Sequence, residues 1–140
     1  MCGILGGNKF KNSDKVKAGL LSIRHRGQDD NTIFSFKNNM YLSHNRLSIQ
    51  DLSEHANQPM VCDENRYYLA FNGELWKTSF DNFDKQLRKK YDFKTEKSDS
   101  ELLLYYLKDN IKNINQALKD IDGMFAFCLY DTKTDTTWLA

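Results

Sequence analysis

The sequence predicts one mixed α+β domain in which strands and helices are stacked in layers. Segments with the composition of short strands alternate with segments that place apolar residues at helical spacing. Residues 124–130 are apolar without alternation, as in a strand that is covered on both faces in a layered sandwich. The length of 140 residues suits a single domain with a substantial core, and no repeat or linker divides the sequence.

Four strands and one helix are expected in the first half of the chain. Asn12-Ser13-Asp14 can cap a helix over residues 14–24, which would place Val16 and Leu20 on one face. The strands are expected at 2–6, 32–36, 40–49 and 66–71, with a hairpin turn at 38–39 and a polar loop over 50–59. Asn72-Gly73 is a strong turn signal and is expected to end the fourth strand.

The second half is expected to be mainly helical before it returns to strands. The first helix would carry apolar residues at helical spacing, namely Trp76, Phe80, Phe83, Leu87 and Tyr91. Ser98-Asp99-Ser100-Glu101 has the form of a capping box and would start a helix that ends near residue 108. A third helical stretch covers 111–118, and strands follow at 124–130 and from 136 onward.

Composition argues against several classes of function. The 20 basic and 19 acidic residues are interspersed and leave a net charge of +1, which disfavours nucleic-acid binding. No apolar run approaches the roughly 20 residues that cross a bilayer, so no membrane partner is expected. Three cysteines and three histidines lack the spacing of metal ligands, and an odd cysteine count argues against a disulfide framework. We therefore expect a metal-free, cytoplasmic protein with reduced cysteines.

Cys2 is the first candidate for chemistry. Once the initiator methionine is removed, this residue carries a thiol and a free α-amine whose ordinary pKa is about 7.7–8.0. Such an amine can accept the thiol proton and later return it to a leaving group. A small buried cysteine in a first strand is the alternative.

Two charged residues could bind an amino-acid substrate. Arg46 has the same parity as Leu42 in the predicted strand 40–49, so it would face the interior, where a cation needs a partner such as a carboxylate. A solvent-facing arginine is the alternative. Asp99 lies in the first turn of a predicted helix, where it could accept hydrogen bonds from an ammonium group or simply interact with the helix dipole.

Asn72-Gly73 also has a functional interpretation besides the turn. The side-chain amide of Asn72 and the backbone N–H of Gly73 could both donate to one oxyanion. Glu74 follows directly and could equally be a solvated carboxylate.

Seven segments, taken in order, closely resemble the class II glutamine amidotransferase domains, and above all the glutaminase domain of glutamine-hydrolysing asparagine synthetases. They span essentially the whole chain: Met1-Cys2-Gly3-Ile4, Arg24-His25-Arg26-Gly27, His44-Asn45-Arg46-Leu47-Ser48-Ile49, Gln58-Pro59, Phe71-Asn72-Gly73-Glu74, Ser98-Asp99-Ser100-Glu101 and Gly123-Met124-Phe125-Ala126-Phe127.

The resemblance implies an N-terminal-nucleophile hydrolase domain over residues 1–140, a four-layer α/β/β/α sandwich. It implies that Cys2 attacks the side-chain amide of L-glutamine, forms a γ-glutamyl thioester and releases ammonia, with no cofactor. The implied oxyanion donors are Asn72 and Gly73. The implied glutamine-binding residues are Arg46 for the α-carboxylate, Asp99 for the α-ammonium, and Leu47, Ser48, Ile49, Gln50 and Glu74 for the rest of the pocket.

The sequence departs from the synthetase pattern at two places. Gln28 stands where a proline is usual, and Arg26-Gly27-Gln28-Asp29 instead resembles the amidophosphoribosyltransferase glutaminases. The pattern also continues past residue 140 into an Arg-Asp motif and further strands, so a domain truncated at its C-terminus, with an incomplete second sheet, is expected. ATP and Mg²⁺ would be needed only by a synthetase domain, whose glycine-rich phosphate loop this sequence lacks.

Three functions are therefore compatible with the sequence. The first is a glutaminase that supplies ammonia to an asparagine-synthetase-type reaction, on a separate synthetase chain or a missing C-terminal portion. The second is an inactive remnant or a regulatory glutamine-binding module. The third keeps the enzyme class and changes the ammonia acceptor to a phosphoribosyl compound or a sugar phosphate.

Overall fold

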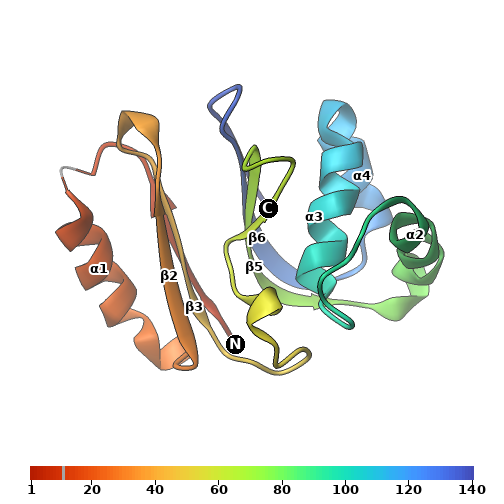
Figure 1. Ribbon diagram of the computed structural model, residues 1–140, viewed down its shortest axis with the longest axis horizontal. Helices are drawn as coiled ribbons and strands as arrows, with labels where there is room; N and C mark the ends of the chain where they lie inside the picture. Colours follow the sequence, from red (N-terminus) through yellow and green to blue (C-terminus); the bar gives the residue numbers. More distant parts are fainter. Residues whose placement is uncertain (11) are drawn as a thin grey trace.

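The computed structural model describes residues 1–10 and 12–140, and of residues 77–81 it describes the backbone alone, so Phe80 lies outside the described side chains. Two antiparallel sheets face each other, with one helix outside the first sheet and the remaining helices outside the second (Figure 1). This is the predicted four-layer α/β/β/α sandwich.

The N-terminal layer pair contains a three-stranded sheet, in the order β1-β3-β2, and helix α1. The elements are β1 (Gly3–Gly7), α1 (Ser13–Ser22), a 3₁₀ turn (Arg24–Arg26), β2 (Asp30–Ser35), a second 3₁₀ turn (Lys37–Asn39) and β3 (Tyr41–Arg46). The side chain of Asn12 caps α1 by accepting a hydrogen bond from the N–H of Lys15. The expected hairpin turn at 38–39 is present, and both asparagines there have positive φ angles.

The second sheet has four strands in the order β4-β5-β6-β7. They are β4 (Met60–Cys62), β5 (Tyr67–Leu75), β6 (Gly123–Asp131) and β7 (Thr136–Leu139), and a 3₁₀ turn (Glu54–Ala56) precedes them. Its outer face is covered by α2 (Lys77–Lys90), α3 (Asp99–Asp109), α4 (Ile114–Ala117) and the flanking 3₁₀ turns Ile111–Asn113 and Leu118–Asp120 (Figure 1). Among the described residues, no helix is long and apolar enough to cross a membrane.

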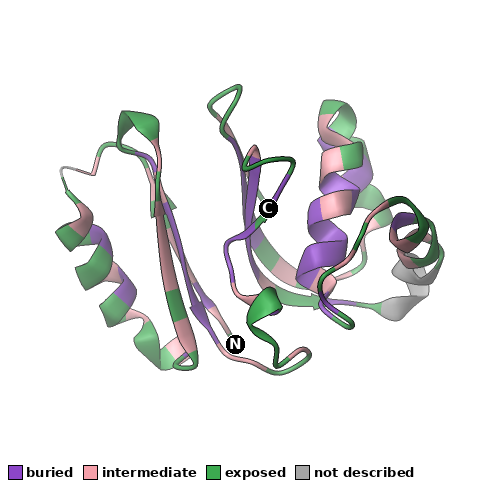
Figure 2. Ribbon diagram, in the orientation of Figure 1, coloured by how far each residue is buried: buried purple, intermediate pink, exposed green. Residues whose placement is uncertain are grey.

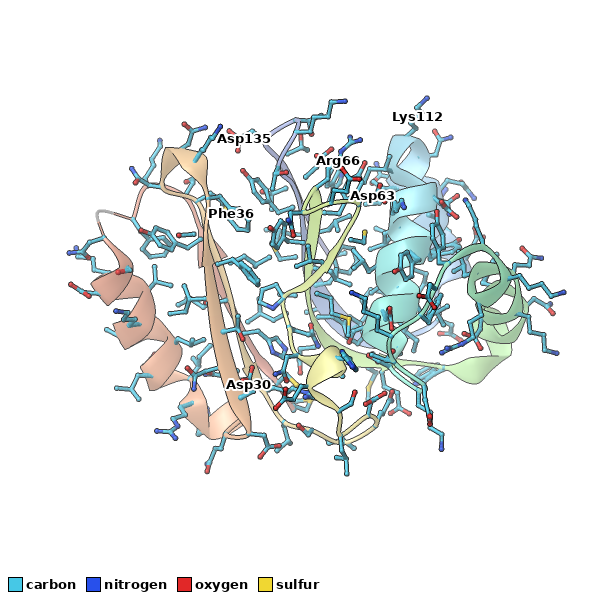
Figure 3. The ribbon with its side chains drawn as sticks, viewed as in Figure 1. Asp30, Phe36, Asp63, Arg66, Lys112 and Asp135 are labelled. Atoms are coloured by element: carbon cyan, nitrogen blue, oxygen red, sulfur yellow. The ribbon has the colours of Figure 1, made fainter. Side chains whose placement is uncertain are left out.

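The core consists of two apolar layers, seen as the buried faces of the sheets and helices in Figure 2. One layer joins the two sheets and includes Leu42, Ala70 and Cys128. Phe36 contributes from the β2–β3 hairpin (Figure 3), with its ring centroid 4.7 Å from those of Tyr68 and Tyr130. The larger layer joins the second sheet to α3 through residues that share full burial: Leu69, Leu103, Leu107 and Leu129. Strand β6 is buried on both faces from Phe127 to Asp131, as its apolar sequence predicted, but Met124 and Ala126 in its first half are exposed.

Three expectations about the strands were wrong. Strand β5 does not stop at Asn72-Gly73 but runs through this pair to Leu75, because β6 pairs with it as far as Gly123. Strand β3 ends at Arg46 instead of residue 49, and the short strand β4 was not expected.

The capping box before α3 is correct in position but not in its hydrogen bonds. Ser98 occupies the N-cap position without a side-chain capping bond. The Glu101 carboxylate turns instead to the preceding loop, where it accepts from the N–H groups of Lys94 and Thr95 at 3.0 and 2.8 Å.

Candidate active site

One cavity of about 320 Å³ is lined by all ten residues predicted for the site. They are Cys2, Arg46, Leu47, Ser48, Ile49, Gln50, Asn72, Gly73, Glu74 and Asp99. Arg46 has the same inward parity as Leu42 on β3, and Asn72 has the same inward parity as Ala70 on β5, so both side chains face the space between the sheets. The volume of the cavity is at the lower end of the range for small-molecule sites.

Cys2 is held at the end of β1 by both its backbone and its sulfur. Arg26 donates from Nε to the Cys2 carbonyl oxygen at 2.8 Å, and the next residue, Gly3, pairs with Asn45 of β3. The backbone N–H of Leu47 donates to Cys2 Sγ at 3.4 Å. The thiol therefore has a fixed position on the cavity wall, with one N–H donor that would also stabilise a thiolate.

Met1 lines the same cavity. While Met1 is present, the nitrogen of Cys2 is a peptide nitrogen with no basic lone pair. The predicted proton acceptor exists only after Met1 is removed, and removal also clears the cavity wall next to the thiol.

Arg46 is a buried cation, only 6 % exposed, that is oriented by the following loop. Its Nη1 donates to the carbonyl of Ser53 at 2.9 Å and to Asn57 Oδ1 at 2.6 Å, and its Nη2 donates to the carbonyl of Asp51. All three acceptors are uncharged, so the positive charge is available to a carboxylate in the cavity.

The backbone after Arg46 leaves the sheet and contacts the Arg26–Asp29 segment. Gly27 lies against this backbone so closely that a Cβ atom would be 2.5 Å from the Arg46 carbonyl carbon. The carboxylate of Asp29 accepts from the N–H of Ser48 at 2.7 Å, and the N–H of Asp29 donates to the Arg46 carbonyl at 3.0 Å. The Arg26–Asp29 segment therefore holds the Leu47–Gln50 wall in place.

Asn72 and Gly73 lie in the β5–β6 ladder opposite Ala126 and Phe125. A Cβ on Gly73 would be 2.2 Å from the Met124 carbonyl oxygen and 2.5 Å from Phe125 Cα, so only glycine fits between the two strands. The pair therefore marks a close approach of two backbones beside the cavity, not a turn.

Asp99 brings a carboxylate to the cavity from the start of α3. Its Oδ2 accepts a hydrogen bond from the N–H of Leu75 at 3.1 Å. Burial, with repulsion from Glu74, raises the pKa of Asp99 to about 6 despite that hydrogen bond. The described side chains form no ion pair with this carboxylate, and an ammonium group placed in the cavity would supply one.

Sequence reasoning assigned no role to several other polar residues of the cavity wall. Gln58 and Ser100 line it and are joined by a hydrogen bond of 3.1 Å between Gln58 Nε2 and Ser100 Oγ. Gln58 was part of the family resemblance, but its partner could be found only from the packing of α3 against β5. Within the described part of the chain, no group of three or more His, Cys, Asp or Glu side chains could hold a metal ion.

Comparison with known proteins agrees with this geometry. The sequence model of the family described as "Glutamine amidotransferase domain" matches residues 1–140. This chain is a member of that family.

The curated relatives include three glutamine-hydrolysing asparagine synthetases. The chain is 33 % identical to a putative one from Methanocaldococcus jannaschii, 38 % to asparagine synthetase 1 of Saccharomyces cerevisiae and 36 % to asparagine synthetase B of Escherichia coli. The alignments cover 95–96 % of this chain but only 28, 23 and 24 % of the relatives, so the chain spans about a quarter of their length.

A solved structure of the glutamine phosphoribosylpyrophosphate amidotransferase from B. subtilis has a similar fold. It superposes with a TM-score of 0.69 over 94 % of this chain and 35 % of that one, at 21 % identity. This likeness confirms the four-layer α/β/β/α sandwich that the family resemblance implied.

Proposed function

We propose that this amidotransferase domain hydrolyses L-glutamine to glutamate and ammonia through a thioester on Cys2. The observation that carries the proposal is one cavity lined by the Cys2 thiol, the buried Arg46 guanidinium, the Asp99 carboxylate and the Asn72-Gly73 pair. Free L-glutamine presents a matching amide, α-carboxylate and α-ammonium.

Two charged side chains of the cavity wall would orient the amino-acid part of glutamine. Arg46 binds the α-carboxylate with the guanidinium hydrogens that the loop acceptors leave free. Asp99 accepts from the α-ammonium, and Glu74 adds negative charge beside it. The segment Leu47, Ser48, Ile49 and Gln50 encloses the side chain and directs its amide toward Cys2.

The first half of the reaction forms the thioester. Cys2 Sγ attacks the amide carbon while its proton passes to the α-amine that removal of Met1 exposes. The resulting oxyanion accepts hydrogen bonds from the Asn72 side-chain amide and the Gly73 N–H. The α-ammonium then returns the proton to the amide nitrogen, the C–N bond breaks and ammonia leaves.

The second half restores the enzyme. A water molecule attacks the thioester carbon and gives a proton to the same α-amine, and the same two donors stabilise the oxyanion. The C–S bond breaks, the sulfur regains its proton, and glutamate leaves. Every proton is thus transferred through Cys2 itself, and no cofactor takes part.

We further propose that the ammonia serves an asparagine-synthetase-type acceptor reaction in a separate chain or a further portion of this protein. The synthetase relatives support this acceptor, and ATP and Mg²⁺ would act there and not at this cavity. A phosphoribosyl compound or a sugar phosphate is the alternative acceptor, supported by the Gln28 segment and by the fold neighbour. The free thiols of Cys2, Cys62 and Cys128 support a cytoplasmic location.

The test is glutamate release from L-glutamine by the purified chain, compared with the Cys2→Ala variant. Intact-mass measurement first establishes the loss of Met1. We expect release by the processed wild type only, and equal rates in the two proteins would overturn the assignment of the nucleophile. A regulatory glutamine-binding module would instead show thermal stabilisation by glutamine in both proteins without any turnover.

A further inference from the structure

The N–H and the carbonyl of Phe71, the residue immediately before Asn72-Gly73, each contact a side chain. Strand β4 pairs with β5 only as far as Leu69, which lies opposite Met60. Two residues further on, the Phe71 N–H donates to Gln58 Oε1 at 2.6 Å, and the Phe71 carbonyl lies 3.1 Å from His44 Nε2. Beyond the end of β4, the side chains of Gln58 and His44 thus form the hydrogen bonds to Phe71 that a neighbouring strand would form.

His44 makes this contact from the opposite sheet. It lies on β3, two residues before Arg46, and is completely buried. Because a carbonyl can only accept, Nε2 carries the proton, and Nδ1 is buried without a hydrogen-bond partner in the described part of the structure. Burial lowers the pKa of His44 to about 4, so the ring is neutral near pH 7. An apolar residue would fill this place without leaving a nitrogen unpaired, which points to a role for the Nε2–H bond.

Gln58 holds the same residue through its N–H and extends the contact to α3. Its orientation is fixed because Oε1 must accept from Phe71 while Nε2 donates to Ser100. Ser100 directly follows Asp99, whose carboxylate accepts from the N–H of Leu75 at the end of the same strand. The oxyanion segment and the proposed ammonium site are therefore tied to each other at two points.

Resting on the proposed glutaminase function, we propose that His44 and Gln58 are positioning residues for the oxyanion hole. By clamping the Phe71 carbonyl and N–H, they fix the peptide planes on either side of Phe71 and so direct the Asn72 amide and the Gly73 N–H at the developing oxyanion. His44 does not line the cavity, and Gln58 lines it with its amide already bonded to Phe71 and Ser100. Because the oxyanion exists only after attack, a loosened clamp lowers kcat and leaves KM nearly unchanged.

Two isosteric replacements of His44 separate positioning from packing. In His44→Gln the amide nitrogen can occupy the place of Nε2 and still donate to Phe71, whereas in His44→Asn it can reach only the place of Nδ1. Ser43→Ala is the matched control, since Ser43 is equally buried on the next position of β3 but bonds the Leu5 carbonyl, at 2.7 Å.

We expect His44→Asn to lose about 10- to 100-fold in kcat with KM within about threefold of wild type, as for displaced catalytic groups elsewhere. His44→Gln should recover kcat to within about threefold, and Ser43→Ala should keep it, even where thermal midpoints fall. Rates are expressed per folded chain. A kcat for His44→Asn equal to that of His44→Gln overturns the proposal.

Two further outcomes remain informative. If His44→Asn does not fold, Gln58→Met releases the Phe71 N–H and is expected to show the same fall in kcat, while an unchanged kcat overturns the proposal. If the processed wild type shows no turnover that depends on Cys2, the proposed function fails, and the positioning role fails with it. Wild-type turnover with unaffected variants refutes the positioning role alone.

Discussion

Glutamine binding should weaken at mildly acidic pH because Asp99 must be ionised to pair with the α-ammonium. Its pKa of about 6 in the empty cavity reflects burial and the neighbouring Glu74. The bound ammonium favours the carboxylate, so protonation competes with binding. The apparent Kd then rises as pH falls through 6, by about twofold at pH 6 and about tenfold at pH 5, relative to pH 8.

This dependence can be measured without turnover in the Cys2→Ala chain. Isothermal titration with L-glutamine from pH 5 to 8, at constant ionic strength, gives Kd directly. Adding Asp99→Asn should weaken binding by about 2–5 kcal/mol at pH 8, because the ammonium loses its partner. It should also remove the pH dependence, so that the difference between the two proteins is smaller at pH 5 by about 1.4 kcal/mol. Asp14→Asn makes the same change of charge at an exposed site on α1 and should alter neither. A Kd that stays constant down to pH 5, or a slope that survives Asp99→Asn, would refute this reasoning.

Three other perturbations test separate parts of the structure. Gly73→Ala should lower kcat by at least about 100-fold and should also lower the thermal midpoint, because the new Cβ meets the β6 backbone. Gly19→Ala is the control, since its new Cβ meets only the Leu5 side chain. Arg46→Lys should raise KM by about 10- to 100-fold in steady-state assays with little loss of folding, since a lysine cannot bind the loop acceptors and a carboxylate together. The pKa of His44 is about 4 in the folded protein, against an ordinary value of 6.5. The free energy of unfolding therefore has its full value above pH 6.5 and falls by about 3 kcal/mol as the pH falls to 4, because the unfolded chain binds the proton first. Urea titrations at each pH should show this loss in the free energy of unfolding for wild type but not for His44→Gln. Asp99 makes a pH-dependent contribution of the opposite sign, which is the same in both proteins and cancels in the comparison.

The pattern of the sequence was sufficient where a local signal and the tertiary structure agree. The parity of Arg46 with Leu42 predicted an inward cation, and the apolar run of β6 predicted a strand covered on both faces, which holds from Phe127 onward. Asn72-Gly73 shows the opposite case. The turn preference of this dipeptide is a local effect. The nine paired positions between β5 and β6 stabilise an extended backbone more strongly, so the strand continues past Gly73.

The roles of His44 and Gln58 could not be predicted from the sequence because their partner lies far away along the chain. His44 is 27 residues from Phe71, and the two meet only because one sheet packs on the other. Gln58 is 42 residues from Ser100, and their contact depends on how α3 lies against β5. Neither separation has a periodicity that a sequence could display.

The two charges of the cavity explain how a site this small would select free glutamine. Arg46 donates to uncharged acceptors. Asp99 accepts only backbone N–H groups among the described residues, and burial raises its pKa to about 6. A free α-amino acid compensates both charges at once. A glutamine residue within a peptide has neither the ammonium nor the carboxylate, so its entry would leave two buried charges unpaired, which costs more than the side-chain contacts return. Selectivity for the free amino acid therefore follows because, among the described side chains, neither group has a partner of opposite charge.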